Sequence, residues 1–222
     1  MSYCSRVPKD VKRRAYHSPR RTEQARATRR VVLQAARRLF ETKGYAGTTI
    51  EAVAADAEVS PETVYATFAG KRGLLSELVD VTIAGDDAPV PILERPWVGE
   101  MRAEPDPRRR LRIMAHHGRL MLERWGDLAA VLSGAAASDP KIGGLWERNK
   151  EQRLTGQRAL LRIATEGATL RAGLTREAAT DIVFAVGSPE VYRLLVVDRA
   201  WSPGRFERWY AETLERLLLP PA

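Results

Sequence analysis

The sequence predicts an all-α protein. Apolar residues recur at helical spacing over about residues 22–84 and again from Pro107 to residue 219, and no segment alternates apolar and polar side chains as a half-buried strand does. Two helix starts are marked by a capping residue followed by proline, at Ser60-Pro61 and Asp139-Pro140. The 222 residues, 44% of them hydrophobic and 29% charged, are enough for one large or two small domains with proper cores.

The chain begins with a basic arm, residues 1–21. Its seven basic side chains and one acidic one, Asp10, give a net charge of +6 out of +8 for the whole sequence. Few apolar residues and two prolines predict that the arm is disordered by itself. Its arginines suit the phosphates or the minor groove of a nucleic acid, and a solubilising tail is the alternative.

The first predicted helix spans Thr22–Lys43 and ends at Gly44. Its buried stripe consists of Val32, Ala36, Leu39 and Phe40, and its N-terminal part carries Arg26, Arg29 and Arg30. We expect the stripe to pack behind the next two helices and make a three-helix unit. The arginines are candidates for phosphate contacts, although a solvated face is the favoured interpretation for any one of them.

Residues 48–71 predict two short helices joined by a tight turn. Thr48 and Glu51 have the spacing of a capping box at the first start. Ser60 is the expected N-cap of the second helix, with Pro61 in its first position. Val59 and Val64 have the spacing of a hydrophobic staple. The outer face of the second helix suits insertion into a major groove, and an ordinary helical hairpin is the alternative.

Residues 32–75 resemble the N-terminal domain of the TetR-family transcriptional regulators. The resemblance rests on Ala35-Ala36, Leu39-Phe40, Gly44-Tyr45, Thr48-Thr49-Ile50, Val53-Ala54, Ala57, Val59-Ser60, Thr63-Val64-Tyr65, Phe68, Lys71 and Leu74-Leu75. It implies a helix-turn-helix DNA-binding domain. One departure is Ala66-Thr67-Phe68-Ala69, where many members carry Tyr-His-Phe, so this helix has fewer groups for phosphates.

The motif match implies DNA-contacting residues on and beside the second short helix. Glu62 and Thr63 are expected to meet base edges. Other side chains are expected to contact mainly phosphates, namely Thr49, Ser60, Tyr65, Thr67 and Lys71. Pro61 lies on the outward face of the same helix and completes the predicted DNA-binding set.

Further helices are predicted beyond the resemblance, the first at Arg72–Ala84. Five prolines between Gly85 and Pro107 predict an irregular connection in which Trp97 and Met101 are packed. The later segments expected to be helical are Leu111–Trp125, Asp127–Ala137, a long helix from Asp139-Pro140 to about Gly167, Thr175–Ala200 with a break at Gly187-Ser188-Pro189, and Ser202–Leu219.

The last two segments carry more apolar residues than one narrow stripe needs. Either both faces are buried in the monomer, or Thr175–Ala200 and Ser202–Leu219 form a four-helix bundle with a second copy. The family resemblance implies the second, a homodimer. The expected division of the chain is the arm 1–21, a DNA-binding domain 22–70, and a helical ligand-binding and dimerisation domain 71–222.

A regulatory cavity between the middle helices is a further expectation. Its candidate lining residues are Met114, His117, Gly118, Met121, Trp125, Trp146, Asn149, Arg153 and Phe184. Soft and aromatic walls suit an apolar or planar small molecule, and ordinary core packing is the alternative for each residue. His116-His117 is not expected to bind a metal, because adjacent helical side chains point about 100° apart.

Other classes of function find no support in the sequence. No catalytic residue pair, metal-site spacing, cofactor motif, secretory signal or apolar run of membrane-spanning length is present, so we expect no enzyme, no cofactor and no membrane. The single cysteine, Cys4, cannot form a disulfide within the chain, which fits the reducing cytoplasm. The resulting interpretation is a homodimeric repressor that binds a palindromic double-stranded operator and is released by a small-molecule effector. An activator and a ligand-independent architectural DNA-binding protein remain as alternatives.

Overall fold

The computed structural model describes residues 19–85 and 90–221, with only the backbone described for residues 19–22. The basic arm predicted for residues 1–21 therefore lies almost wholly outside the described residues. Within them the regular structure is helical and contains no strand, which confirms the all-α prediction. None of the described helices is both long enough and apolar enough to cross a bilayer.

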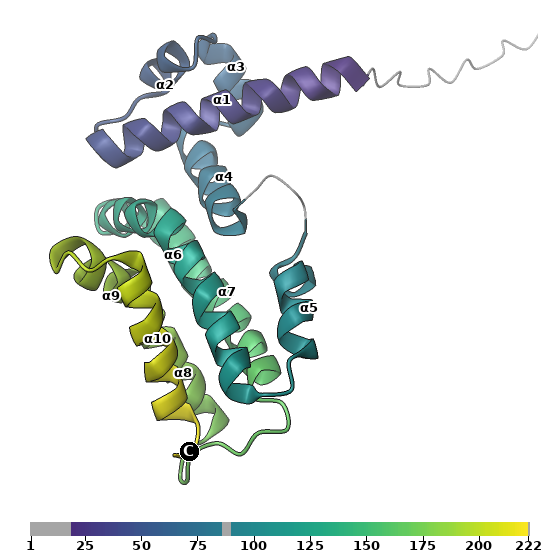
Figure 1. Cartoon of the computed structure of the whole chain (residues 1–222). Coiled ribbons are helices and arrows are strands. Elements are labelled where there is room, and N and C mark those ends of the chain that lie inside the picture. Colours follow the sequence, from purple (N-terminus) through teal and green to yellow (C-terminus); the bar gives the residue numbers. More distant parts are fainter. Residues whose placement is uncertain (1–18, 86–89, 222) are drawn as a thin grey trace, which may run out of the picture.

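The first four helices are α1 (Pro19–Lys43), α2 (Ile50–Asp56), α3 (Pro61–Phe68) and α4 (Lys71–Ala84). Figure 1 shows α1, α2 and α3 gathered at one end of the molecule, with α4 leading from them to the other helices. Phe40, Val53 and Val64 are fully buried where α1, α2 and α3 meet. The amphipathic stripe of α1 thus packs behind the helix pair as predicted.

The start of α2 differs from the predicted capping box. Thr49 is the N-cap, and its hydroxyl oxygen accepts a hydrogen bond from the Ala52 N–H at 3.1 Å. Thr48 is fully buried, and its hydroxyl lies 3.0 Å from the Leu39 carbonyl and 2.8 Å from that of Gly44. The prediction was one residue out because Thr48 and Thr49 both suit a cap, and only the packing of the loop before α2 decides between them.

The remaining elements are η1 (Ile92–Glu94), α5 (Pro96–Ala103), α6 (Pro107–Ala136), α7 (Pro140–Ala164), α8 (Arg176–Val186), α9 (Pro189–Arg193), a π-helical turn η2 (Leu194–Asp198) and α10 (Pro203–Leu218). The break predicted at Gly187-Ser188-Pro189 is confirmed, because Ser188 caps α9 after α8 has ended. The connection after α4 is more regular than predicted. It contains η1 and the helix α5, in which Val98 and Met101 are fully buried.

Helix α6 is continuous, whereas the sequence predicted two helices separated at Gly126. The reason lies in packing. A Cβ atom added to Gly126 would lie 3.4 Å from the ring of Tyr192 in α9. The glycine therefore allows close approach of a neighbouring helix within α6 and does not end it.

A single hydrophobic cluster joins the first four helices to the rest of the molecule. It contains Leu74, Leu75 and Leu78 of α4 together with residues at the nearer ends of α6 and α7, namely Trp125, Leu128, Leu132, Ile142 and Leu145. Helix α4 therefore packs on both the helix-turn-helix unit and the bundle. The domain boundary placed after residue 70 stays a prediction.

Candidate DNA interface and ligand cavity

Helix α3 has one buried face and one solvent face. Val64 and Phe68 point into the cluster, while Glu62, Ala66 and Thr67 are exposed. Tyr65 is the most prominent outward side chain, with 52% of its surface accessible. Thr63 is partly exposed at the first turn. The outward face is thus small and polar with one aromatic ring, which is compatible with a major groove.

Local hydrogen bonds fix the first turn of α3. The Ser60 hydroxyl oxygen accepts from the Thr63 N–H at 3.3 Å and lies 3.1 Å from the Thr63 hydroxyl. The Thr67 hydroxyl donates to the Thr63 carbonyl at 2.7 Å. Three of the predicted contact residues therefore already take part in internal hydrogen bonds. Because a hydroxyl also has acceptor capacity, these bonds orient the groups without removing them from the surface.

Glu62 is held in its charged form. Its carboxylate accepts hydrogen bonds from its own backbone N–H and from the Ser60 side chain, and these bonds lower its pKa from the ordinary value. A carboxylate at the N-terminus of a recognition helix can accept a hydrogen bond from the amino group of cytosine. The geometry thus offers a negatively charged acceptor at the end of α3 that would face DNA.

Lys71 has an internal role that its sequence position did not reveal. Its ammonium group donates to the carbonyls of Tyr45 and Thr48, both at 2.9 Å, and lies 4.3 Å from the centre of the Tyr45 ring. These contacts fasten the loop between α1 and α2 to the start of α4. One of the three ammonium donors is left for another partner. The predicted phosphate contact of Lys71 is therefore at most a shared role.

The arginines of α1 are divided between internal contacts and solvent. Arg29 forms an ion pair with Glu77 of α4, and its guanidinium lies 5.5 Å from the centre of the Phe68 ring. Arg38 pairs with Asp56 of α2 at 2.6 Å. Arg26 and Arg30 are exposed. The latter two are the α1 arginines best placed for an external anion.

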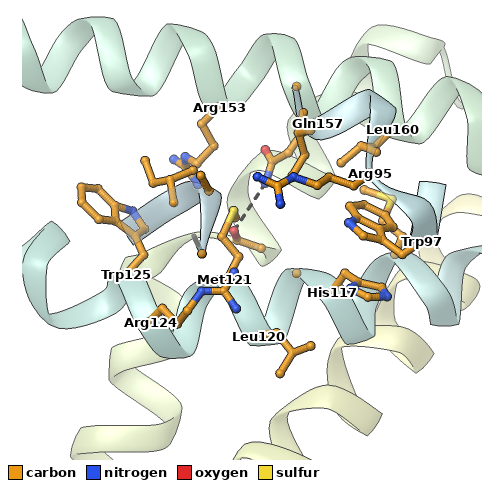
Figure 2. Close-up of a pocket in the computed structure, with 18 of the residues that line it drawn as sticks. Arg95, Trp97, His117, Leu120, Met121, Arg124, Trp125, Arg153, Gln157 and Leu160 are labelled. Carbon is orange, nitrogen blue, oxygen red and sulfur yellow. Dashed lines mark hydrogen bonds between the residues drawn. The ribbon is translucent and has the colours of Figure 1, made fainter. Parts of the chain in front are cut away.

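A cavity of about 440 Å³ lies between α6 and α7. This volume is within the range of about 300–1,000 Å³ typical of small-molecule sites. Figure 2 shows Arg153, Gln157 and Leu160 on one side, His117, Met121 and Trp125 on the facing side, and Arg95 and Trp97 at one end. Ile83, Ala84 and Gly85 at the end of α4 also line the cavity.

The structure brings seven of the nine predicted pocket residues to this cavity, namely Met114, His117, Gly118, Met121, Trp125, Asn149 and Arg153. The other two do not line it. Trp146 packs on the cluster formed by the first four helices, 5.9 Å from the ammonium of Lys150. Phe184 is covered by the guanidinium of Arg153, whose central carbon lies 3.8 Å from the centre of its ring.

Three polar side chains of the cavity, Arg153, Gln157 and His117, are held by specific neighbours. The Arg153 guanidinium donates to the Phe184 carbonyl at 3.1 Å, and burial lowers the pKa of this arginine. The Gln157 amide donates to the Gly187 carbonyl at 3.4 Å, whereas its buried Oε1 has no hydrogen-bond partner. His117 stacks on Trp97 with ring centres 4.5 Å apart, and its pKa is lowered by burial and then by His116. Among the described residues there is no cluster of three metal-ligating side chains.

The comparisons with known proteins agree with the geometry of α1–α4. Residues 32–78 match the family model described as bacterial regulatory proteins, tetR family. The chain therefore carries the DNA-binding domain of the TetR family over these residues. It is therefore a transcriptional regulator with a helix-turn-helix DNA-binding unit. No curated protein matches the sequence.

Solved structures extend this likeness from the DNA-binding domain to the whole fold. NalD, the secondary repressor of the MexAB-OprM multidrug efflux pump in Pseudomonas aeruginosa, is 21% identical with a TM-score of 0.65, covering 89% of this chain and 100% of its own. A protein from Mesorhizobium loti assigned to the TetR family is 21% identical with a TM-score of 0.64, and the match covers 87% of this chain and 96% of that protein. A protein from Saccharomonospora viridis, solved in complex with choline, is 18% identical with a TM-score of 0.65, and the match covers 88% of this chain and 100% of that protein.

Several residues that line the cavity were not predicted from the sequence. Gln157 and Leu160 continue the helical spacing of Asn149 and Arg153, so that periodicity could have found them. Arg95, Trp97 and Tyr210 come from distant elements and had no local signal. The Tyr210 side chain fits between two glycines. A Cβ atom on Gly118 would lie 3.1 Å from its ring, and one on Gly187 would lie 2.2 Å from its hydroxyl oxygen.

Proposed function

We propose that this TetR-family chain is a cytoplasmic, homodimeric repressor that binds a palindromic operator and is released by a small-molecule effector. The recognition helix α3 would enter the major groove, with Glu62 and Thr63 at base edges. The effector would occupy the cavity between α6 and α7. NalD, which shares the fold, is described as a repressor, and this supports repression over activation.

The observation that carries the proposal is the double contact of α4. Its last residues, Ile83, Ala84 and Gly85, line the cavity, while Leu74 and Leu75 near its start are buried with the helix-turn-helix unit. A molecule that displaces the end of α4 would therefore also displace α3. An effector shifts such a balance only by its different affinities for the two positions of α4.

A second contact connects the cavity to α1. The Arg37 guanidinium donates to the carbonyl of Arg124 at 2.8 Å, and the Arg124 side chain lines the cavity. A Cβ atom on Gly85 would lie 2.9 Å from the Arg124 guanidinium, so this arginine is also packed on the end of α4. Movement at Arg124 would reach both α1 and α4.

The proposed homodimer is supported by apolar surface near the end of the chain. Leu194 and Val197 of η2 are 54% and 52% exposed, and Leu195 and Val196 are only partly covered. Such a patch needs a partner to be removed from water. Sedimentation should give a dimer, and Leu194→Glu should shift it to monomer. Glu51→Ala, an exposed change on α2 outside the segments predicted to dimerise, is the control and should leave the dimer intact.

The experiment that tests the proposed function begins with selection of operator duplexes from random DNA by the purified full chain. The recovered operator is then titrated with and without ligands found by thermal-shift screening. A palindromic operator whose affinity falls with a bound ligand is the expected result. If the protein selects no DNA sequence, the proposal that it binds a specific operator is wrong. If operator affinity stays the same with every ligand, the architectural alternative is favoured. If expression from a promoter fusion increases when the protein is present, the protein is an activator and not a repressor.

A further inference from the structure

We propose that the cavity between α6 and α7 selects an apolar anion that also carries a hydrogen-bond donor. The proposal rests on the sensing role proposed above and names the chemical class of the effector. The groups that would recognise it are Arg153 and Gln157, one helical turn apart on the same face of α7. Figure 2 shows both side chains on the α7 side of the cavity, facing Met121 of α6.

Arg153 supplies the positive charge. A guanidinium has five N–H donors, and among the described residues that of Arg153 makes a single hydrogen bond, to the Phe184 carbonyl. Burial acts against its charged form, and Glu190 favours that form without making an ion pair with Arg153. A bound anion would satisfy the remaining donors and offset the cost of burying the charge, because charge-assisted hydrogen bonds are about twice as strong as neutral ones.

Gln157 supplies the acceptor. Its side chain is buried, with only 7% of the residue exposed, and its Oε1 has no partner. The orientation of the amide is set by the Gly187 carbonyl, which can accept a hydrogen bond only from the NH₂ group. The unpartnered oxygen therefore requires a donor, such as a hydroxyl or an N–H, from whatever occupies the cavity.

The apolar side chains that line the cavity indicate what the uncharged part of the ligand is like. The apolar lining comprises Met114, Met121 and Trp125 of α6, Leu160 of α7, and Trp97 of α5. These soft and aromatic surfaces suit a planar apolar body. Among the described lining residues none is acidic, so the wall offers no carboxylate to a cation such as choline. The expected ligand is thus an apolar, aromatic anion rather than a cation.

The test uses two fluorescent probes that share three aromatic rings and an N–H donor. One, 8-anilinonaphthalene-1-sulfonate, carries a sulfonate; the other, N-phenyl-1-naphthylamine, is uncharged. Titration of the full chain in the absence of DNA should give at least about tenfold tighter binding of the sulfonate, as expected for a hydrogen bond to a charged group. Choline should not displace it. Equal affinities for the two probes, or displacement by choline, would overturn the anion preference.

Variants assign the selectivity to named residues. Arg153→Gln and the nearly isosteric Gln157→Glu should each weaken the sulfonate probe by about 10–100-fold while changing the neutral probe little. Arg148→Met, which removes an exposed charge from the same helix, is the matched control and should leave both affinities unchanged. Equal losses in the control and in Arg153→Gln would show a non-specific charge effect and overturn the proposal.

A cavity-filling variant separates this proposal from the sensing role. Gly156 lines the cavity on α7, and a Cβ atom there would meet nothing within 4 Å. Gly156→Leu should abolish binding of both probes, because its side chain enters the space they occupy. If Gly156→Leu loses both probes but the parent binds the two probes equally, the cavity is a binding site and only the preference for an anion is refuted. Unchanged binding in Gly156→Leu would place the probes outside the cavity and overturn the site itself.

Discussion

The helix pair α2–α3, here called the reading unit, is held by contacts between residues close in the sequence. The cavity between α6 and α7 is built from residues far apart in the sequence. The caps of α2 and α3 are made within four residues, by Thr49 with Ala52 and by Ser60 with Thr63. The cavity walls come from residues as distant as Ile83 and Tyr210. The reading unit is thus held by short-range hydrogen bonds on a small core, and the cavity by long-range packing that leaves space.

This difference determines how each region can change. The outward face of α3 contributes little to the core, so its side chains can change the DNA sequence that is read without changing the fold. The cavity has Arg153 and Gln157 in a buried space where each has spare hydrogen-bonding capacity. A ligand there changes the interactions of several helices together, including α4.

The largest expected effect tests whether the core below α3 holds the reading unit. Val64 is fully buried, so Val64→Ala should lower the free energy of unfolding by about 1.5–3 kcal/mol, from lost burial and the cavity left behind. Urea denaturation measures the change. Val31→Ala makes the same chemical change in α1 at a side chain that is 43% exposed, and it should be neutral or slightly stabilising. Equal losses in both variants would contradict this account of the core.

The next effect concerns the outward face of the same helix. Glu62→Ala should relax the base preference at one position per half-site by about 1–3 kcal/mol, because the charged acceptor is lost. The unfolding free energy should barely change, since Glu62 is exposed. Selection of operators by the variant measures the preference. Glu51→Ala, an exposed glutamate on α2, is the control, and an unchanged operator for Glu62→Ala would remove Glu62 from base reading.

The sequence predicted the reading unit better than the cavity, because the first depends on contacts between near residues and the second on contacts between distant ones. Helical periodicity and the Ser60-Pro61 start predicted α3 and its buried Val64 and Phe68, because these signals are local. The glycine at 126 was interpreted as a helix end, although it accommodates Tyr192 from 66 residues further along the chain. Seven lining residues of the cavity were predicted from the spacing along α6 and α7. Arg95, Trp97 and Tyr210 were not, because only tertiary packing brings them there.

The smallest expected effect is a pH dependence originating at the cavity. His117 has its pKa lowered, chiefly by burial, so the unfolded chain binds a proton at a pH where the folded chain does not. Stability should therefore fall as the pH drops through the unfolded pKa of about 6.5 and level off below the folded pKa. His117→Gln should flatten this dependence. The charged and titratable neighbours that contribute are His116, Glu100, Arg124 and Glu207.

A matched variant distinguishes this effect from that of the neighbouring histidine. His116 lies 2.9 Å from a carboxylate oxygen of Glu207, outside the cavity lining. His116→Gln removes a different interaction and should keep the fall in stability that burial of His117 causes. Denaturation midpoints between pH 5 and 8 measure both variants. A profile that His117→Gln leaves as steep as that of the parent would show that this histidine is not its source.

The central claim is that the cavity and the reading helix are coupled through α4. Its most direct test is the operator affinity of the parent and of Gly156→Leu, each measured with and without a cavity-binding ligand. Gly134→Leu, at another open helical glycine, is the control. Ligand should weaken operator binding by about 5–150-fold in the parent and the control, and operator should weaken ligand binding by the same factor. Gly156→Leu should bind operator normally and ignore the ligand, whereas a response equal to the parent's would contradict the account.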